Sequence, residues 1–246
     1  MENRPMPRLF VVRHGETEWS QQGCVTGRTD IPLTEHGVEQ IRQCAPLLVG
    51  EGKVIDPKNL CTVFVSPRRR HDNLSFHHAS SHKTFHLLFE GHELPHHVLT
   101  ESCREWDYGD YEGLNPKEIQ AIRPGWLIWR DGCPGGESIE QMQARVDSVI
   151  EQVREHHRQY FEGTVNTRDV MVVAHGHFNR CLIARWLKFD LFLGTRLNVQ
   201  TGGVAVLSYN HNNLEEPALN ASVIHLNSML SFGPCLTTCV QIEPAR

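Results

Sequence analysis

The fold is indicated first by a short stretch near the N-terminus, Arg8-Leu-Phe-Val-Val-Arg-His-Gly15. Its apolar, β-branched run is typical of a buried parallel strand, and the run ends abruptly in a basic loop that contains glycine. Two later runs repeat this pattern: residues 61–65 precede Ser-Pro-Arg-Arg-Arg70, and residues 169–174 precede His-Gly-His177. A fourth apolar run covers residues 203–209, so the sequence predicts four strands.

Segments with helical spacing lie between these strands. They cover residues 34–48, 137–160 and 179–187, and a further helix is expected to end at Leu88. Strands that alternate with helices favour a mostly parallel sheet covered by helices, a three-layer α/β/α sandwich. Ligands of such sheets bind beyond the carboxyl ends of the strands, so the three basic loops are predicted to converge at one edge.

Composition limits the class of protein. The 246 residues are 39% hydrophobic and 22% charged, and no run approaches the roughly 20 apolar residues that a bilayer crossing needs. The N-terminus lacks the apolar stretch of a signal peptide, so we expect a cytoplasmic protein, with the nucleus as the alternative and no membrane partner. A net charge of −5 gives no support for nucleic-acid binding. The eight cysteines include no Cys-x-x-Cys pair and are expected to be idle thiols.

The chain is predicted to form one domain over residues 1–220, with two atypical segments. Residues 71–80 interrupt the helix expected after Arg70 and show no helical stripe of their own. Residues 221–246 contain almost no charged side chains and show little helical or strand periodicity, so a loosely held tail is expected there. The residues do not distinguish a monomer from a homo-oligomer.

The loops at the strand ends suggest phosphoryl transfer. An imidazole can attack phosphorus when one ring nitrogen is held as a donor, and His14 stands beside Arg13, whose guanidinium suits phosphate oxygens. Arg70 and His175 are candidates for further charge neutralisation around the same phosphate. The leaving alkoxide needs a proton, and Glu105 lies in an aromatic-rich loop suited to a carboxyl donor.

Six motifs in order then resemble the histidine phosphatase superfamily, with its phosphoglycerate mutase-like fold, over about residues 8–215. They are Arg-His-Gly-Glu-Thr-Glu-Trp19, Thr26-Gly-x-Thr-Asp-x-Pro-Leu-Thr34, Ser66-Pro-Arg-x-Arg70, Arg104-Glu-x-x-Tyr-Gly109, Gly136-Glu-Ser138 and Ala174-His-Gly176. Joint occurrence of six ordered motifs is highly specific.

The resemblance implies a role for each candidate residue. His14 would be phosphorylated transiently, Arg13, Arg70 and His175 would form the phosphate pocket, and Glu105 would act as proton donor and then as base. It implies no metal and no cofactor. Softer predictions place Ser20, Thr26 and Tyr108 against the phosphate or the substrate body and Arg130 against a distal phosphate, with ordinary loop packing as the alternative for each.

The segments 104–113 and 126–137 resemble the fungal sedoheptulose-1,7-bisphosphatase group most. The expected substrate is therefore a small sugar phosphate, with sedoheptulose 1,7-bisphosphate preferred. A fructose-2,6-bisphosphatase-like or broad sugar phosphatase is the alternative. Phosphoglycerate mutase activity is disfavoured because Asp131 stands beside Arg130, where mutases have paired arginines.

Segment 71–80 leaves a further alternative open. It follows Arg70 directly, and a displacement of about 1 Å in a pocket residue can cost on the order of a hundredfold in rate. The chain could therefore be a catalytically weakened phosphate-binding pseudoenzyme. Eight of the 16 histidines lie between His71 and His97, but none combines with Cys or carboxylate at the usual zinc spacing. Only His82 and His86 form a geometrically sensible couple.

Overall fold

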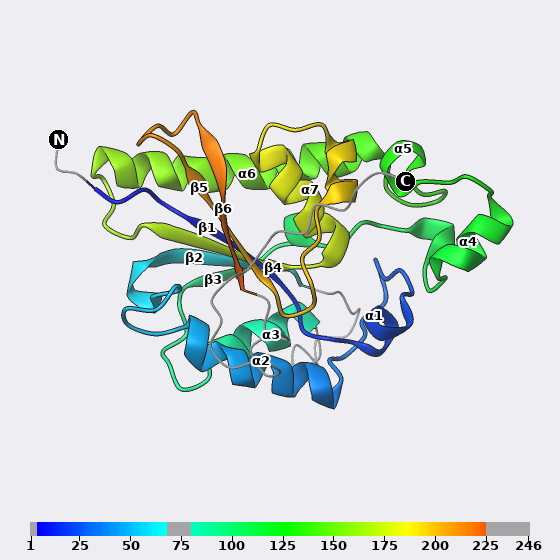
Figure 1. Ribbon diagram of the computed structural model, residues 1–246, viewed down its shortest axis with the longest axis horizontal. Coiled ribbons are helices and arrows are strands. Elements are labelled where there is room, and N and C mark those ends of the chain that lie inside the picture. Colours follow the sequence, from blue (N-terminus) through cyan, green and yellow to red (C-terminus); the bar gives the residue numbers. More distant parts are fainter. Residues whose placement is uncertain (1–3, 68–79, 225–246) are drawn as a thin grey trace.

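A computed structural model describes residues 4–67 and 80–224, with side chains to residue 220. Within these residues the protein forms one six-stranded sheet (Figure 1), in the order β3-β2-β4-β1-β5-β6. The strands are β1 (Leu9–Arg13), β2 (Leu60–Val65), β3 (His97–Leu99), β4 (Asp169–Ala174), β5 (Val204–Tyr209) and β6 (Pro217–Ile224). The first four are mutually parallel; β5 pairs antiparallel with β1, and β6 pairs antiparallel with β5 at the outer edge of the sheet.

Helices cover both faces of the sheet, as Figure 1 shows. Their bounds are α1 (Glu18–Gln22), α2 (Glu35–Leu48), α3 (Ser80–Leu88), α4 (Pro116–Ile122), α5 (Ile128–Asp131), α6 (Ile139–Glu162) and α7 (Gly176–Trp186). Single 3₁₀ turns occupy Pro57–Asn59, Glu101–Cys103 and Gly109–Tyr111, and a longer one occupies Leu191–Arg196. The predicted three-layer α/β/α sandwich with a mostly parallel sheet is confirmed.

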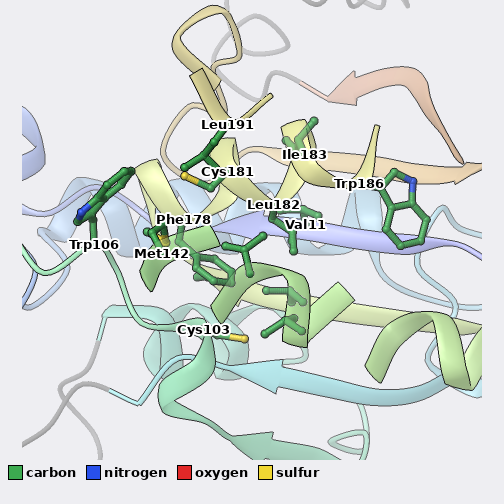
Figure 2. Close-up of a cluster of buried hydrophobic side chains, with 14 of the residues drawn as sticks. Val11, Cys103, Trp106, Met142, Phe178, Cys181, Leu182, Ile183, Trp186 and Leu191 are labelled. Carbon is green, nitrogen blue, oxygen red and sulfur yellow. The ribbon is translucent and has the colours of Figure 1, made fainter. Parts of the chain in front are cut away.

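Alternation along β1 divides the core into two layers. Leu9 and Val11 face the cluster under α6 and α7, while Phe10 and Val12 face the cluster under α2 and α3. Figure 2 shows part of the first cluster, which includes Phe178 and Trp186 of α7 and Val11 of β1. Because β1 is buried on both faces from Leu9 to Val12, these four residues are all apolar and do not alternate with polar ones.

Several element boundaries differ from the sequence-based prediction. Helix α7 begins at Gly176, three residues before the predicted start at Asn179, because a distant carboxylate caps its first turn. Strands β3 and β6 were not predicted. Strand β6 crosses the predicted domain boundary at residue 220, since it pairs with β5 as far as Ile224. Ser80, placed in the predicted insertion, is the buried first residue of α3.

The rest of both atypical segments, residues 71–79 and 225–246, lies outside the described residues. Across the described part of the chain no helix is both long and apolar enough to cross a membrane. The six cysteines found there are free thiols, as expected; they are Cys24, Cys44, Cys61, Cys103, Cys133 and Cys181.

Candidate active site

Two of the predicted loops meet at the carboxyl edge of the sheet. Strands β1 and β4 are parallel neighbours in register from Leu9 opposite Val170 to Arg13 opposite Ala174, so His14 and His175 follow side by side. The His14 backbone N–H donates to Ala174 O at 3.0 Å, and the two imidazole ring centres lie 5.2 Å apart. The predicted convergence is confirmed for these loops. Arg70, in the third loop, lies outside the described residues.

The buried ring of His14 is oriented by its own chain. Its Nδ1 lies 2.7 Å from Gly15 O, an acceptor, so Nδ1 bears the proton and donates it to this bond. In that neutral tautomer the ring's lone pair is on Nε2. Gly15 is packed tightly enough to exclude a side chain, because a Cβ atom there would lie 2.9 Å from Gly37 O. The nucleophile predicted from sequence thus has the nitrogen arrangement that attack on phosphorus requires.

His175 is fully buried at the N-cap of α7. Its Nε2 lies 2.7 Å from Ser66 Oγ, and Ser66 is the residue directly after β2. A third strand end therefore contacts this histidine through a hydroxyl.

Arg13 is a buried cation at the same edge. Its Nη1 donates to Val199 O at 2.9 Å, while Nε is buried with no hydrogen-bond partner among the described residues. Burial lowers the pKa of the guanidinium, and the negative charge of Glu105 opposes this shift. Arginine nevertheless stays charged at any ordinary pH, so Arg13 offers positive charge and an unsatisfied donor to an anion.

Glu105 is buried opposite these groups and caps helix α7. Its Oε1 accepts from the backbone N–H groups of Trp106 at 2.9 Å and Phe178 at 2.8 Å, and its Oε2 accepts from that of His177 at 2.9 Å. The N-terminus of a helix has unpaired N–H groups and favours a negative charge. This contact fixes the carboxylate against the loop that contains His175.

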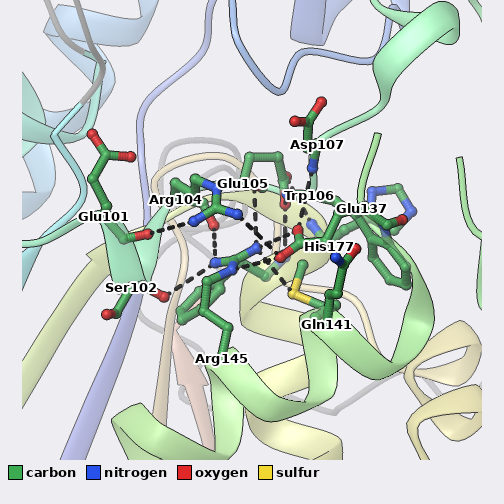
Figure 3. A network of polar contacts seen from close by, with 12 residues as sticks. Glu101, Ser102, Arg104, Glu105, Trp106, Asp107, Glu137, Gln141, Arg145 and His177 are labelled. Atoms are coloured by element: carbon green, nitrogen blue, oxygen red, sulfur yellow. Dashed lines mark hydrogen bonds and ion pairs between the residues drawn. The ribbon is translucent and has the colours of Figure 1, made fainter. Parts of the chain in front are cut away.

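A buried ion-pair network holds the Glu105 loop in place (Figure 3). Arg145 of α6 binds Glu137 through two bonds of 2.8 and 2.7 Å, and Arg104 reaches the same carboxylate at 3.3 Å. Arg145 also donates to the carbonyls of Ser102 and Arg104. The motif Gly136-Glu-Ser138 therefore holds the Glu105 loop in place through Glu137, and its residues are not among those that line the cavity described below.

One cavity borders Arg13, His14 and Glu105, and the fully buried His175 is not among its described lining residues. The cavity is lined by Arg13, His14, Thr17, Ser20, Gly23, Cys24, Val25, Thr26, Glu105, Tyr108, Pro116, Gly176 and His177. The predicted contact residues Ser20, Thr26 and Tyr108 are in this lining. Arg130 is not among the described lining residues, because its exposed guanidinium is bound to Asp131 at 2.9 Å and to Gly125 O at 2.7 Å.

His177 is a lining residue whose side chain was not predicted to take part. Its Nδ1 lies 2.7 Å from the Tyr108 hydroxyl. Burial, with Arg180 and Arg13 nearby, lowers the pKa of His177, whereas burial and the charge of Glu105 raise the pKa of Tyr108. The pair is therefore neutral at physiological pH and presents hydrogen-bonding groups without charge. The sequence signal that could have identified His177 was its position as the second histidine of His175-Gly-His177, directly after a predicted strand.

Comparison with known proteins gives a consistent result. Residues 9–222 match the histidine phosphatase superfamily (branch 1). The chain is 37% identical over 204 residues to an acid phosphatase of Mycobacterium tuberculosis, covering 83% of this chain and 87% of that protein. It is 31% identical over 262 residues to sedoheptulose 1,7-bisphosphatase of Saccharomyces cerevisiae, covering 87% and 91%.

A solved structure of a Mycobacterium tuberculosis open reading frame product is similar in fold. It superposes with a TM-score of 0.70 at 33% sequence identity, over 87% of this chain and 95% of that one.

Proposed function

Because the chain belongs to the histidine phosphatase superfamily (branch 1), we propose that it hydrolyses phosphorylated sugars through a phosphohistidine on His14. The observation that supports this most is the bond from His14 Nδ1 to Gly15 O, which leaves the ring's lone pair on Nε2. Arg13 and His175 lie beside this ring at the ends of adjacent strands. Such a pocket suits phosphoryl transfer, which depends mainly on positioning and charge neutralisation.

In the first step, His14 Nε2 forms a bond to phosphorus while the phosphorus–oxygen ester bond breaks. Arg13, with its buried Nε, and His175 would neutralise the phosphate oxygens, together with Arg70. The leaving alkoxide takes a proton from Glu105. The three backbone donors occupy three of the four lone-pair positions of this carboxyl group, and the fourth, on Oε2, is where the transferred proton would sit.

In the second step, the Glu105 carboxylate removes a proton from water, and the water oxygen attacks phosphorus. The P–N bond to His14 then breaks, which releases inorganic phosphate and returns the imidazole to its starting state. Because one carboxyl group donates a proton in the first step and accepts one in the second, the proton count of Glu105 is unchanged over the cycle. The scheme uses side chains alone, without a metal or cofactor.

The preferred substrate is sedoheptulose 1,7-bisphosphate. The similarity to the yeast enzyme of that name supports this choice, and the hydroxyls of Ser20, Thr26 and Tyr108 in the lining suit a polyol. A broad or fructose-2,6-bisphosphatase-like sugar phosphatase is the alternative, and the similarity to an acid phosphatase favours breadth. We place the protein in the cytoplasm, with the nucleus as the alternative.

The test is phosphate release from a panel of phosphorylated sugars in the presence of a chelator, followed by trapping of the enzyme under alkaline quench. We expect turnover that survives chelation, label on His14, and loss of both in His14→Gln. Glu105→Gln should form the phosphoenzyme slowly from sugar phosphates. A chain that binds sugar phosphates but never becomes labelled is a pseudoenzyme, and this result would overturn the proposal.

A further inference from the structure

Helix α3 contacts the loop that contains His14 through the buried side chain of Thr84. The Thr84 hydroxyl donates to Ser80 O, one helical turn earlier, at 2.7 Å. The same oxygen accepts the backbone N–H of Gly15 at 3.0 Å. Thr84 is fully buried, so both bonds lie away from bulk solvent. Thr84 of α3 thus provides the hydrogen-bond acceptor for the buried N–H of Gly15, the residue that follows His14.

This contact continues to the nucleophile. The N–H of Gly15 is bound by Thr84, and the carbonyl of Gly15 accepts the proton on His14 Nδ1 at 2.7 Å. Glycine has wide backbone freedom because it has no side chain, so side-chain contacts cannot hold the Gly15 carbonyl in one direction. The Thr84 bond anchors one side of Gly15, so it limits where the carbonyl on the other side can point.

We propose that Thr84 is a positioning residue that sets the ring orientation and tautomer of His14 through Gly15. This inference rests on the proposed role of His14 as nucleophile. Loss of the hydroxyl leaves the Gly15 N–H buried and unpaired, and Gly15 then rotates to find another acceptor. The His14 ring loses its fixed acceptor, the tautomer with the proton on Nε2 becomes populated, and that tautomer cannot attack phosphorus.

The experiment compares Thr84→Val, which keeps the side-chain shape, with Thr84→Ser, which keeps the hydroxyl. Ser208→Ala is the matched control, because Ser208 is also a buried hydroxyl bound to a backbone carbonyl, that of Pro7, at the opposite end of β1. The first measurement is the ¹⁵N spectrum of the His14 ring without substrate, assigned against His14→Gln. The second is the single-turnover rate of His14 phosphorylation by sedoheptulose 1,7-bisphosphate.

Thr84→Val should move the proton of His14 from Nδ1 toward Nε2 and slow phosphorylation by about tenfold to a hundredfold, with substrate KM changed by less than about twofold. Thr84→Ser and Ser208→Ala should match the wild type in both measurements. An unchanged His14 tautomer in Thr84→Val would overturn the inference. So would an equal effect in Ser208→Ala, or no recovery in Thr84→Ser.

The two measurements separate this inference from the proposed function. The ring spectrum needs no turnover, so it tests the Thr84 contact even if the wild-type protein never becomes phosphorylated. If the wild-type protein is never labelled but Thr84→Val still shifts the His14 tautomer, the proposed function is refuted. The role of Thr84 in positioning His14 is then still supported.

Discussion

Three buried or half-buried histidines, His14, His177 and His157, differ through their hydrogen-bond partners. His14 donates to a backbone carbonyl, His177 pairs with the Tyr108 hydroxyl, and His157 pairs with the Tyr209 hydroxyl at 2.9 Å. Burial lowers the pKa of His177 and brings that of His157 to about 3. The same side chain thus provides a candidate nucleophile in one place and a neutral structural contact in the others.

Arg13 gives a direct test of the phosphate pocket. Arg13→Lys keeps a positive charge but replaces the planar fork with a point charge, and the contact to Val199 O would no longer orient it. We expect kcat to fall about a hundredfold, which is the usual effect of removing one donor from a transition-state anion site. Steady-state kinetics with a sugar phosphate would measure this effect.

Arg28→Lys is the control for Arg13→Lys. Arg28 is exposed and bound to Asp107 at 2.7 Å, and it does not occur in the described lining of the cavity. Its replacement should leave kcat within about twofold. Equal losses in both variants would show that Arg13 has no special place in the pocket.

The loop before Tyr108 and helix α7 form one unit at the site. Glu105 caps the first turn of α7, and the loop itself is tied to α6 through Arg145 and Glu137. Helices α6 and α7 pack beside each other on the same face of the sheet (Figure 1). Placement of the proton donor therefore depends on three elements that are distant in sequence.

Removal of Glu137 should destabilise this unit. Glu137→Ala leaves the buried guanidinium of Arg145 and that of Arg104 without their carboxylate, and breaking a buried pair in this way costs about 3 kcal/mol or more. Glu151→Ala removes an exposed partner of Arg158 and should cost less than about 1 kcal/mol. Urea unfolding of the two variants measures the difference, and equal midpoints would contradict the assignment.

The stability of the whole molecule should depend on the contact between α6 and β5. His157 is fully buried, its Nδ1 meets Tyr209 of β5, and its ring lies edge-on to Trp186 of α7. Burial and the charge of His156 bring the pKa of His157 to about 3, below its ordinary value of 6.5. Between these two pKa values His157 is therefore neutral in the folded protein and protonated in the unfolded chain.

The sign of the pH dependence follows from this difference. Between pH 6.5 and about 3 the unfolded chain binds more protons at this position, so the contribution of His157 to stability is complete above pH 6.5 and falls as the pH falls. The free energy of unfolding of the wild type should decrease by up to about 1.4 kcal/mol per pH unit more than that of His157→Gln. Urea unfolding from pH 7 to 4.5 tests this, and parallel curves would refute it.

Local sequence was sufficient for four of the six described strands and for placing His14 and His175 at one edge of the sheet. Apolar runs that end in Arg13-His14 and in His175 predict buried strands, and parallel strands place such ends at one edge whatever covers them. Strand β3 was missed because it has three residues, and β6 because its sequence lacks a strand pattern that stands out from the tail.

Only the tertiary structure decided which groups touch. Glu105 caps α7 from 72 residues away, Thr84 binds Gly15 from 69 residues away, and Arg130 turns to Asp131 instead of the cavity. Hydrogen-bond directions depend on how packed elements meet, and no local pattern encodes that geometry. The sequence determined the chemistry that could occur at the edge of the sheet, and packing determined which nitrogen, oxygen and proton are in place for it.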